Sequence, residues 1–562
     1  MNKRDYDAII IGSGLGGLAC GATLAKTGKK VLVLEQHDLI GGCATCFKRK
    51  GMLIDAGLHE MDWGSEKTDM KHIVFKKLGL FEKITLVPLP SAWTVRVLDS
   101  KLESSGKEAK SPSDTDSKTQ DFLIPHRSTK EALISYFPHE KKGLEKYFKK
   151  LHFQARLNYK FPFDMGFLEF FFAPLHTLSF LTLSALRQRK VGNMLDILIK
   201  DSKLKKILNI NMAYYHYDAW KFNWNFHAIA QANYYHQGMY IKGGSQSLSN
   251  ALADIIKENG GELRAKCEVK EILLDDKKAI GVAFVDSTNS ESKAKGEQRL
   301  FAEKIVANCD PRIVYEELLH TDTSKDFGAI QNFSTKTSLA SVYMIFDTNL
   351  SQKFPDMDYS TFCVDKEYFD KPFDRDNEDM LAQDIEKRGF VFVNYSKIDS
   401  GLSDREDRYF GVITTLSSYE EWENLSKEEY RAKKEHARKA FEARLEAFFP
   451  GIMAHCIHSE FATPKTIERY TRAKKGTPYG WDQDLEGFFA RSAFKSKSVT
   501  NLYFASAFGF PGSGFTGALL SGYRTARKML DPYFYPRRLS LCVLFGVAVS
   551  VLVIEGIGLV LG

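Results

Sequence analysis

The sequence predicts an α/β fold that opens with a strand, a helix and a second parallel strand, and three observations in the first sixty residues predict it. An apolar run over residues 8–11 is typical of a central parallel strand buried on both faces. A glycine-rich turn follows directly, and a second apolar run, residues 31–34, ends at the acidic Glu35. Because strand, glycine turn, helix and terminal acid stand in the order of a dinucleotide-binding unit, we expect a Rossmann-like domain.

Each glycine of the turn has a separate physical role. Gly12 permits the tight turn, Gly14 lets the backbone approach a pyrophosphate, and Gly17 lets the helix pack close to the strand. The helix expected over residues 15–27 points its free N–H groups and the positive end of its dipole at the phosphates. Glu35 follows about twenty residues on, where a carboxylate accepts hydrogen bonds from a ribose hydroxyl. The pattern therefore predicts a bound dinucleotide.

A second glycine pair, Gly41-Gly42, distinguishes between dinucleotide cofactors. Residues 35–45 and 51–59 resemble the FAD-binding start of phytoene desaturases, carotenoid isomerases and retinol saturases. Within that superfamily, the Gly-Gly-Cys and Asp-x-Gly-x-His patterns are most similar to the isomerase and retinol-saturase branch. The resemblance implies FAD as cofactor. It also implies an α/β fold in which a Rossmann-like FAD-binding domain is split in sequence by an inserted α+β substrate domain of the amine-oxidase/desaturase type.

Three later segments resemble the same superfamily and occur in its order. Residues 238–244 resemble the glycine pair that opens a helix, and Val269 matches a residue whose backbone contacts the adenine. Residues 306–311 resemble a strand that leads to an Asp-Pro turn. Residues 501–517 resemble the C-terminal motif that closes over the flavin ring and ribityl chain. Ser506-Ala507 stands where carotenoid isomerases often have Gly-Asp, a departure that moves the resemblance toward desaturases and saturases.

These segments supply the predicted cofactor contacts and the candidate catalytic groups. The predicted cofactor-binding residues are Gly12, Ser13, Gly14, Gly16, Gly17, Glu35, Gln36, Gly41, Gly42, Cys43, Val269, Asp310, Pro311, Ser506, Pro511, Gly512, Gly514, Phe515 and Thr516. The candidate acid/base residues near the flavin are His59, His236, Tyr240 and Tyr479. Each of the four is equally explained as a packing residue. Residues 214–217 are typical of pocket lining or of helix packing, and no metal site is predicted.

The order of the segments divides the chain into a split cofactor domain and an inserted substrate domain. The FAD-binding domain is expected to comprise residues 1–95, 236–322 and 463–530. The substrate domain, which would also contact the membrane, is expected to comprise residues 123–235 and 323–462. Between the first two of these segments, residues 96–122 are predicted to form a disordered polar insertion, and residues 531–562 a C-terminal apolar helix.

Composition limits the classes of partner. The chain has 562 residues, enough for two or more structural domains, and 13% of them are aromatic, which favours a large apolar binding surface or a phenylalanine-rich core. The net charge of +7 is small for this length and argues weakly for contact with anionic membrane lipid. A nucleic-acid partner is not expected, because that function calls for a dense basic stripe. Eight cysteines do not make a disulfide scaffold.

Two apolar segments predict contact with a membrane. Arg537-Arg538 precede an apolar stretch, residues 539–562, interrupted only by Glu555. As a helix this stretch is long enough to cross a bilayer, and the arginines would favour the cytoplasmic side. Residues 161–186 are rich in phenylalanine and are typical of an interfacial patch or of a buried cap over the site. We therefore expect a membrane-associated protein with a cytoplasmic catalytic domain and a C-terminal transmembrane or interfacial anchor. The alternative is an apolar helix packed on the protein itself or on a partner.

The resemblance implies chemistry on carbon–carbon bonds. The expected reaction is hydride and proton transfer on a long apolar polyene, a carotenoid or retinoid, by a desaturase, a saturase or a cis–trans isomerase. NAD(P)H or a quinone is the candidate electron partner. Two alternatives stay open. One is a non-catalytic prenyl or lipid escort of the GDP-dissociation-inhibitor type. The other is a flavin amine oxidase, although that class usually carries a basic residue where this chain has Cys43.

Overall fold

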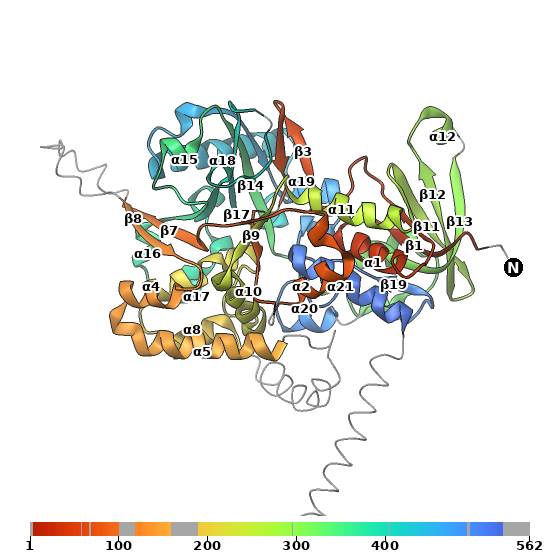
Figure 1. Ribbon diagram of the computed structural model, residues 1–562, viewed down its shortest axis with the longest axis horizontal. Coiled ribbons are helices and arrows are strands. Elements are labelled where there is room, and N and C mark those ends of the chain that lie inside the picture. Colours follow the sequence, from red (N-terminus) through yellow and green to blue (C-terminus); the bar gives the residue numbers. More distant parts are fainter. Residues whose placement is uncertain are drawn as a thin grey trace, which may run out of the picture.

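The chain forms two halves, each built around one seven-stranded sheet. The structure, a computed structural model, describes residues 4–57, 59–66, 69–99, 119–158, 189–294, 296–403, 405–491 and 495–531. The two halves lie side by side in Figure 1, with strands β1, β11, β12 and β13 in one and β7, β14 and β17 in the other. We call them the parallel-sheet half and the mixed-sheet half.

The parallel-sheet half has the predicted strand–helix–strand unit at its centre. Its strands in spatial order are β10 (Glu262–Arg264), β2 (Val31–Leu34), β1 (Tyr6–Ile11), β13 (Glu297–Ala307), β12 (Lys278–Asp286) and β11 (Cys267–Asp275), with β19 (Leu502–Phe504) also on β13. β10, β2, β1, β13 and β19 run parallel, whereas β12 is antiparallel to both its neighbours. Strand β13 is long enough to join the parallel and antiparallel strands, because its start pairs with β12 and its end with β1.

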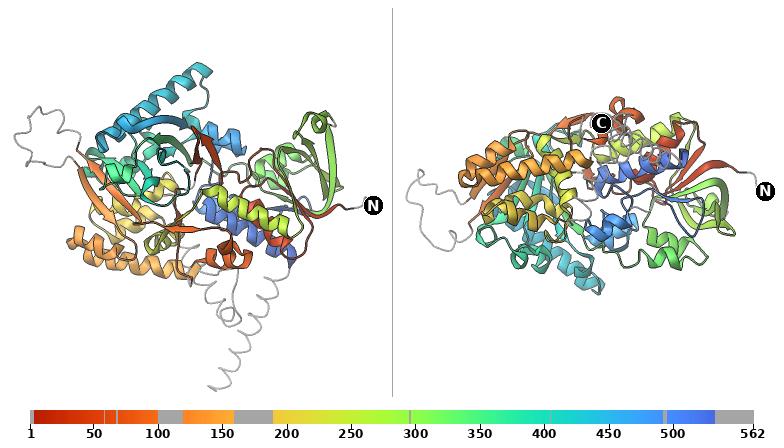
Figure 2. Two further views of the ribbon diagram at one scale, coloured as in Figure 1. Left: turned by 45° about the horizontal axis from the view of Figure 1, so that its top comes forward. Right: turned by 90° about the horizontal axis from the view of Figure 1, so that it is seen from below.

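Alternating side chains of the central strands supply two separate cores. Ala8 and Ile10 of β1 pack toward α1 (Leu15–Ala25), α11 (Ser245–Glu258) and α21 (Gly514–Leu530), whereas Ile9 and Ile11 pack on the opposite face. This follows from the two-residue period of a strand, and it explains why the run had to be apolar throughout. Figure 2 shows α11 and α21 lying together on the parallel-sheet half.

The mixed-sheet half is covered by helices on both faces. Its strands in spatial order are β18 (Cys456–Ala462), β14 (Ser338–Phe346), β17 (Tyr409–Ser417), β16 (Phe390–Asn394), β15 (Ser360–Asp365), β7 (Trp93–Leu98) and β8 (Thr119–Ile124). α18 (Lys427–Phe448) packs on one face. The other face is covered by α4 (Thr129–Tyr136), α5 (Lys141–Asn158), α8 (Val191–Leu198), α9 (Ser202–Asn209) and α10 (Trp224–His236).

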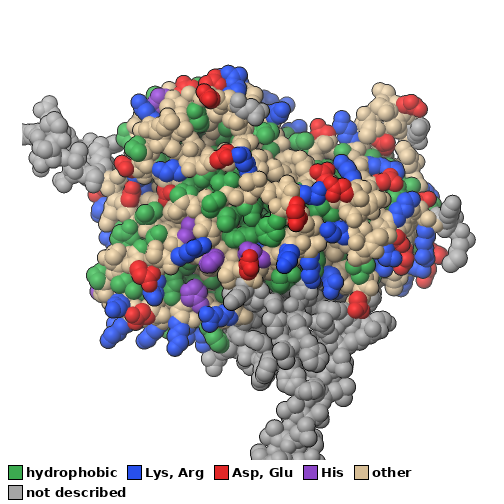
Figure 3. Space-filling view, viewed as in Figure 1, with side chains coloured by type: hydrophobic (Ala, Val, Ile, Leu, Met, Phe, Trp, Pro, Cys, Tyr) green, Lys and Arg blue, Asp and Glu red, His purple; other side chains and the backbone are tan. Residues whose placement is uncertain are grey.

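Two small sheets and several short helices complete the described chain. The small sheets are β3 (Cys46–Arg49) with β4 (Met52–Asp55), and β5 (Met61–Asp62) with β9 (Gly238–Ile241) and β6 (Leu86–Pro88). Figure 3 shows hydrophobic side chains gathered near the middle of this face, around the position of β9 in Figure 1. The shorter helices are α2 (Met70–Leu78), α12 (Ser290–Ala294), α13 (Pro311–Ile313), α14 (Ser324–Gly328), α15 (Leu350–Lys353), α16 (Lys366–Asp370), α17 (Arg375–Glu378), α19 (Pro464–Thr471) and α20 (Leu485–Ala490).

The predicted fold class is confirmed. The parallel-sheet half is assembled from three separated stretches, residues 6–34, 245–307 and 502–530, and the strands of the mixed-sheet half come from the chain between them. The segment predicted as a polar insertion, 96–122, overlaps β7 and β8 at its two ends. Its remainder, 100–118, lies outside the described residues, as does the phenylalanine-rich segment 161–186.

The predicted membrane location is corrected. Within the stretches of chain that the structure describes, no helix is both long and apolar enough to cross a membrane. The two longest described helices, α5 and α18, are rich in lysine, arginine and glutamate and lie on the mixed-sheet half. The last described helix ends at Leu530, and the C-terminal segment on which the anchor prediction rested falls outside the described residues from 532 onward.

Candidate functional site

The first glycine turn is packed too tightly for larger residues. Gly12 has φ +93° and follows directly from β1. A Cβ on Gly17 would lie 2.4 Å from the Gly12 carbonyl oxygen, which accounts for a glycine where α1 approaches the strand. Gly42 has φ +62°, and a Cβ there would lie 3.3 Å from Gly14 Cα. The turn after β1 and the Gly41-Gly42 turn are therefore in direct backbone contact.

Glycine also sets the approach of helix α21 to helix α1. A Cβ on Gly522 would lie 2.0 Å from the Gly16 carbonyl oxygen, and one on Gly16 would lie 2.3 Å from the Ala505 carbonyl oxygen. Ser506, which follows, is buried, and its Oγ accepts a hydrogen bond from the Phe508 amide at 3.2 Å. The C-terminal segment thus lies against the first turn of α1, as the predicted cofactor contacts require.

Glu35 ties the end of β2 to the glycine turn. Its Oε2 accepts hydrogen bonds from the Ser13 amide at 2.9 Å and from Ser13 Oγ at 2.6 Å. The Glu35 carbonyl accepts a hydrogen bond from the Cys267 amide at 2.7 Å, which brings β11, and Val269 within it, beside the predicted ribose position. Gln36 follows Glu35 and is partly exposed. Residues from three distant stretches of sequence therefore meet at this corner.

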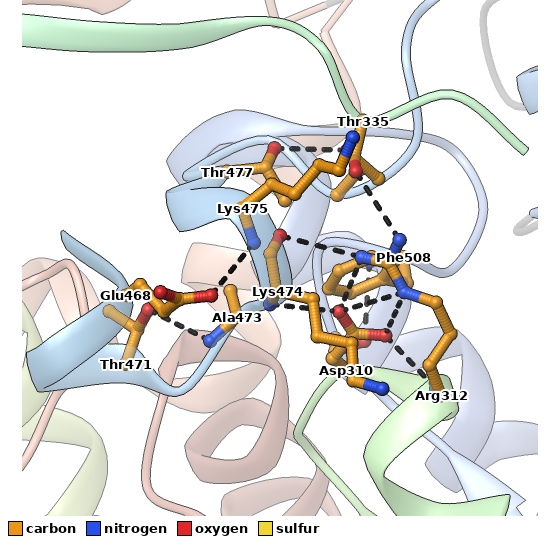
Figure 4. A network of polar contacts seen from close by, with 12 residues as sticks. Asp310, Arg312, Thr335, Glu468, Thr471, Ala473, Lys474, Lys475, Thr477 and Phe508 are labelled. Atoms are coloured by element: carbon orange, nitrogen blue, oxygen red, sulfur yellow. Dashed lines mark hydrogen bonds and ion pairs between the residues drawn. The ribbon is translucent and has the colours of Figure 1, made fainter. Parts of the chain in front are cut away.

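The carboxylate of Asp310 is engaged within the protein. It is 2% exposed and forms an ion pair with Arg312 at 2.6 Å, and its Oδ2 accepts a hydrogen bond from the Lys474 amide at 3.1 Å. Figure 4 shows this network, in which Arg312 also reaches Thr335. Pro311 begins α13. Asp310 thus joins α13 to the loop at Lys474, and its cofactor contact stays a prediction.

The start of α21 is tied to the strand β5. Thr516 Oγ1 donates to Asp62 Oδ1 at 3.2 Å, and the other oxygen of Asp62 accepts a hydrogen bond from Asn233 of α10 at 2.7 Å. Before the helix the chain passes through a cis peptide bond at Pro511 and through Gly512. The remaining predicted residues here, Gly514 and Phe515, are the first two residues of α21.

These residues fit a dinucleotide. No side chain caps the N-terminus of α1, which follows Gly14, or that of α21, which follows Ser513. Uncapped N–H groups at a helix start, next to a turn that excludes side chains, are suited to a phosphate. Glu35, at the end of the next strand, is suited to a ribose. The chemistry of the donors therefore agrees with the cofactor that the sequence predicts.

Two of the candidate acid/base residues have their polar atoms fully used by the protein. His59 is buried, with Nδ1 3.0 Å from the Tyr395 hydroxyl and Nε2 2.9 Å from Thr414 Oγ1. Burial lowers the pKa of His59 to about 4, so the ring is neutral at physiological pH. The Tyr240 hydroxyl donates to Asp55 at 3.0 Å. The geometry of both residues is that of structural hydrogen bonding.

The other two candidates lie in different places. His236 ends α10, and partial burial lowers its pKa. Tyr479 lies close to Cys43, since the Cys43 thiol adds to the effect of burial in raising the pKa of Tyr479. Burial also raises the pKa of Cys43 to about 11, so this thiol is protonated at neutral pH. Of the four candidates, Tyr479 is the one that adjoins a predicted flavin contact.

The structure also identifies a buried acid that sequence reasoning missed. Glu60 is 9% exposed, and its Oε1 has no hydrogen-bond partner. Its Oε2 accepts a 3.4 Å hydrogen bond from Ser360 Oγ. Burial raises the pKa of Glu60 to about 8, with Asp358 and Asp62 adding to the increase and Ser360 opposing it. Its place next to His59 in the resembled segment was the available signal, but only the fold reveals its burial.

Glu60 lies where the two halves of the molecule meet. Its neighbour His59 is bonded to the mixed sheet through Thr414, and Asp62, two residues on, is bonded to the first turn of α21. The hydroxyl of Tyr214 nearby has no hydrogen-bond partner, and the charge of Glu60 adds to the burial that raises the pKa of Tyr214. Tyr479 acts on Tyr214 in the same sense. Unpaired protic groups therefore lie close to the predicted flavin contacts.

An apolar hollow in the mixed-sheet half ends at this cluster. It lies between the sheet and the segment formed by α9 and the 3₁₀ helix η4 (Ile210–Tyr214), with about 800 Å³ of atom-free space. Tyr214 and Thr414 line it, and both adjoin the segment at His59 and Glu60. The apolar portion of its wall consists of Ile210, Met212, Ala213, Leu339, Phe362, Val364, Phe390, Val391 and Leu416. Volume and lining are those of a small-molecule site.

Fold and glycine turns together define a dinucleotide-binding α/β protein. Residues 15–530 match the family described as flavin containing amine oxidoreductase, and the chain belongs to that family. A putrescine oxidase variant has the same fold, with a TM-score of 0.59 and 15% identity over 94% of this chain and 99% of that one. The protein is therefore an oxidoreductase of a flavin-containing family.

Relatives with curated functions are similar over almost the whole chain. A prolycopene isomerase of Daucus carota is 26% identical over 94% of this chain and 80% of its own length. An all-trans-retinol 13,14-reductase of Danio rerio is 25% identical over 92% and 86%. A neurosporene-forming phytoene desaturase of Rhodobacter capsulatus is 25% identical over 93% and 94%. The resemblance to carotenoid isomerases, retinol saturases and phytoene desaturases is confirmed, and neither the escort nor the amine-oxidase alternative is favoured.

Proposed function

We propose that the protein is an FAD-dependent oxidoreductase that acts on carbon–carbon double bonds of a long apolar polyene, a carotenoid or retinoid. The observation that carries this proposal is the apolar hollow that ends at Tyr214 and Glu60, beside the predicted flavin contacts. The names of the three relatives, an isomerase, a reductase and a desaturase, support the same substrate class.

The hollow suits a substrate that forms few hydrogen bonds. A polyene gains affinity mainly by leaving water, at about 25 cal/mol per Å² of apolar surface. Burying about 300 Å² would then supply about 7 kcal/mol before the costs of binding are subtracted. Phe362 and Val391 of the sheet face Ile210 and Met212 across the hollow, which allows an extended chain to lie between them.

In the proposed mechanism the residues of the chain hold, orient and protonate. Bound FAD would supply hydride exchange with one carbon of the polyene. The glycine turn, Glu35 and Val269 would hold the dinucleotide. Glu60, protonated at neutral pH because of its raised pKa, would give a proton to the neighbouring carbon or, once ionised, remove one. Tyr214 and Tyr479, both in the buried cluster, would orient the polyene and exclude water.

The electron partner and the direction of the reaction belong to the same proposal. Glu60 can serve as acid in saturation, as base in desaturation and as both in isomerisation, so one site serves all three directions. NAD(P)H and a quinone are the proposed electron partners for the two net redox directions.

The proposal is tested with purified protein and a panel of polyenes. Detergent-purified protein is reconstituted with FAD and incubated without oxygen with phytoene, a cis-lycopene or retinol, with NADPH, with a quinone or with neither. Products are separated by chromatography. We expect conversion of one polyene in one redox condition. A protein that binds no FAD, or that oxidises an amine such as putrescine while converting no polyene, would refute the proposal.

A further inference from the structure

One wall of the hollow carries buried polar atoms that the protein leaves unpaired. Asn209, the last residue of α9, is 5% exposed, and its Oδ1 has no hydrogen-bond partner. Glu378, the last residue of α17, is 4% exposed, and its Oε1 has none either. Both side chains line the hollow. Burial of such atoms is costly unless something pairs with them, so their position in an otherwise apolar wall points to a ligand group.

The two side chains belong to one fixed cluster. Lys206 and Asn209 are three residues apart on α9 and so share a face of that helix. Lys206 Nζ donates to the carbonyl oxygens of Tyr368 and Lys371, the latter at 2.8 Å, and lies 3.7 Å from Glu378 Oε1. The other oxygen of Glu378 accepts a hydrogen bond from the Tyr368 hydroxyl at 2.9 Å. The protein thus holds the carboxyl group in place and leaves Oε1 available.

The charges and hydrogen-bonding groups of this cluster select one kind of ligand group. An anionic end group would meet the carboxylate of Glu378, and a cationic one would meet the ammonium of Lys206, so neither suits the site. The amide of Asn209 carries both a donor and an acceptor, and the carboxylate oxygen accepts. A neutral hydroxyl both donates and accepts, so it can pair with the two side chains at once. A hydrocarbon end would leave both unpaired.

We propose that Asn209 and Glu378 bind the hydroxyl end group of an otherwise apolar polyene, so that the substrate is an alcohol rather than a pure hydrocarbon. This inference rests on the proposed function, which places a polyene in the hollow. It adds the identity of one end of that polyene and the residues that recognise it.

Matched alcohols and hydrocarbons test the site by binding alone. The FAD-reconstituted protein is titrated with all-trans-retinol and its 15-deoxy hydrocarbon, and with β-cryptoxanthin and β-carotene, following tryptophan fluorescence. We expect the alcohol of at least one pair to bind about tenfold to a hundredfold more tightly, because the hydrocarbon leaves buried polar groups unpaired. Asn209→Leu should reduce this preference to below about threefold. Glu378→Gln should reduce it less, because a neutral amide accepts a weaker hydrogen bond than a carboxylate.

The control is Met380→Leu, an apolar change in the same wall, which should leave the preference intact. Circular dichroism and FAD content establish that each variant is folded, and Glu378→Gln serves if Asn209→Leu is not. Equal binding of alcohol and hydrocarbon in both pairs, or an undiminished preference in a folded Asn209→Leu or Glu378→Gln protein, would overturn the inference alone. Binding of no polyene would overturn both this inference and the proposed function. Selective binding of an alcohol that is never converted would uphold the binding site and contradict the proposed redox reaction.

Discussion

Replacing Glu60 by glutamine should remove a carboxyl group that the folded protein keeps protonated at neutral pH. Burial raises the pKa of Glu60 to about 8, from 4.5 for an exposed glutamate. The difference of about 3.5 units corresponds to about 5 kcal/mol of extra cost for ionising this group in the fold, at 1.36 kcal/mol per unit. At pH 7 the folded protein should hold about ten protonated Glu60 side chains for each ionised one.

The sign of the pH dependence follows from this pKa difference. Between about pH 4.5 and pH 8 the unfolded chain ionises Glu60 while the folded protein does not, so the wild-type free energy of unfolding falls as the pH rises. Glu60→Gln lacks this loss. We expect the variant to gain about 4 kcal/mol on the wild type between pH 5 and pH 8.5.

Two assays measure these effects. Infrared difference spectroscopy of wild type against Glu60→Gln should show a protonated carboxyl band at pH 6.5 that disappears by pH 9.5. Urea unfolding at pH 5 and pH 8.5 gives the free energies. The control is Glu66→Gln, the same change at a position outside this buried cluster. An ionised Glu60 at pH 6.5, or equal pH dependence in wild type and variant, would refute the reasoning and remove Glu60 as a proton donor at neutral pH.

Three further changes test the cofactor site and the hollow. Gly522→Ala should destabilise the protein by about 1–3 kcal/mol, because its Cβ would meet the Gly16 carbonyl oxygen at 2.0 Å, and a thermal melt at or above the wild-type midpoint would contradict this contact. Glu35→Gln should weaken FAD binding by about tenfold to a hundredfold by replacing charged hydrogen bonds with neutral ones, as measured by equilibrium dialysis; unchanged affinity would place the ribose elsewhere. Val391→Trp should fill much of the hollow and abolish polyene conversion while FAD content stays at the wild-type level, and full activity in this variant would exclude the hollow as the polyene site.

The sequence predicted the parallel-sheet half well because its signals are local. The apolar run of β1, the glycines after it and the acid after β2 each act within a few residues of one another, so their spacing is informative. The long β12–β13 hairpin was also predictable, since two apolar runs flank a polar tip. Gly16 and Gly522, by contrast, meet only when α1 and α21 cross, and no local pattern reveals that contact.

The catalytic region of the site could not be predicted in the same way. His59 stands in a recognisable pattern, yet Tyr395 and Thr414, which occupy both its nitrogens, are more than three hundred residues away in sequence. Glu60 looks like any surface glutamate until the fold buries it beside Ser360. Whether a polar side chain is free to act depends on long-range partners, and single-sequence reasoning does not see them.

The central claim is that a flavin and a polyene meet at the inner end of the hollow. Anaerobic single-turnover mixing tests it most directly: FAD-loaded protein, oxidised or chemically reduced, is mixed with each polyene while the flavin spectrum and the product are followed in one sample. We predict that product forms in one of the two flavin states, that it requires FAD, and that Val391→Trp abolishes it. Absence of product in both states, or equal product without FAD, would contradict the account.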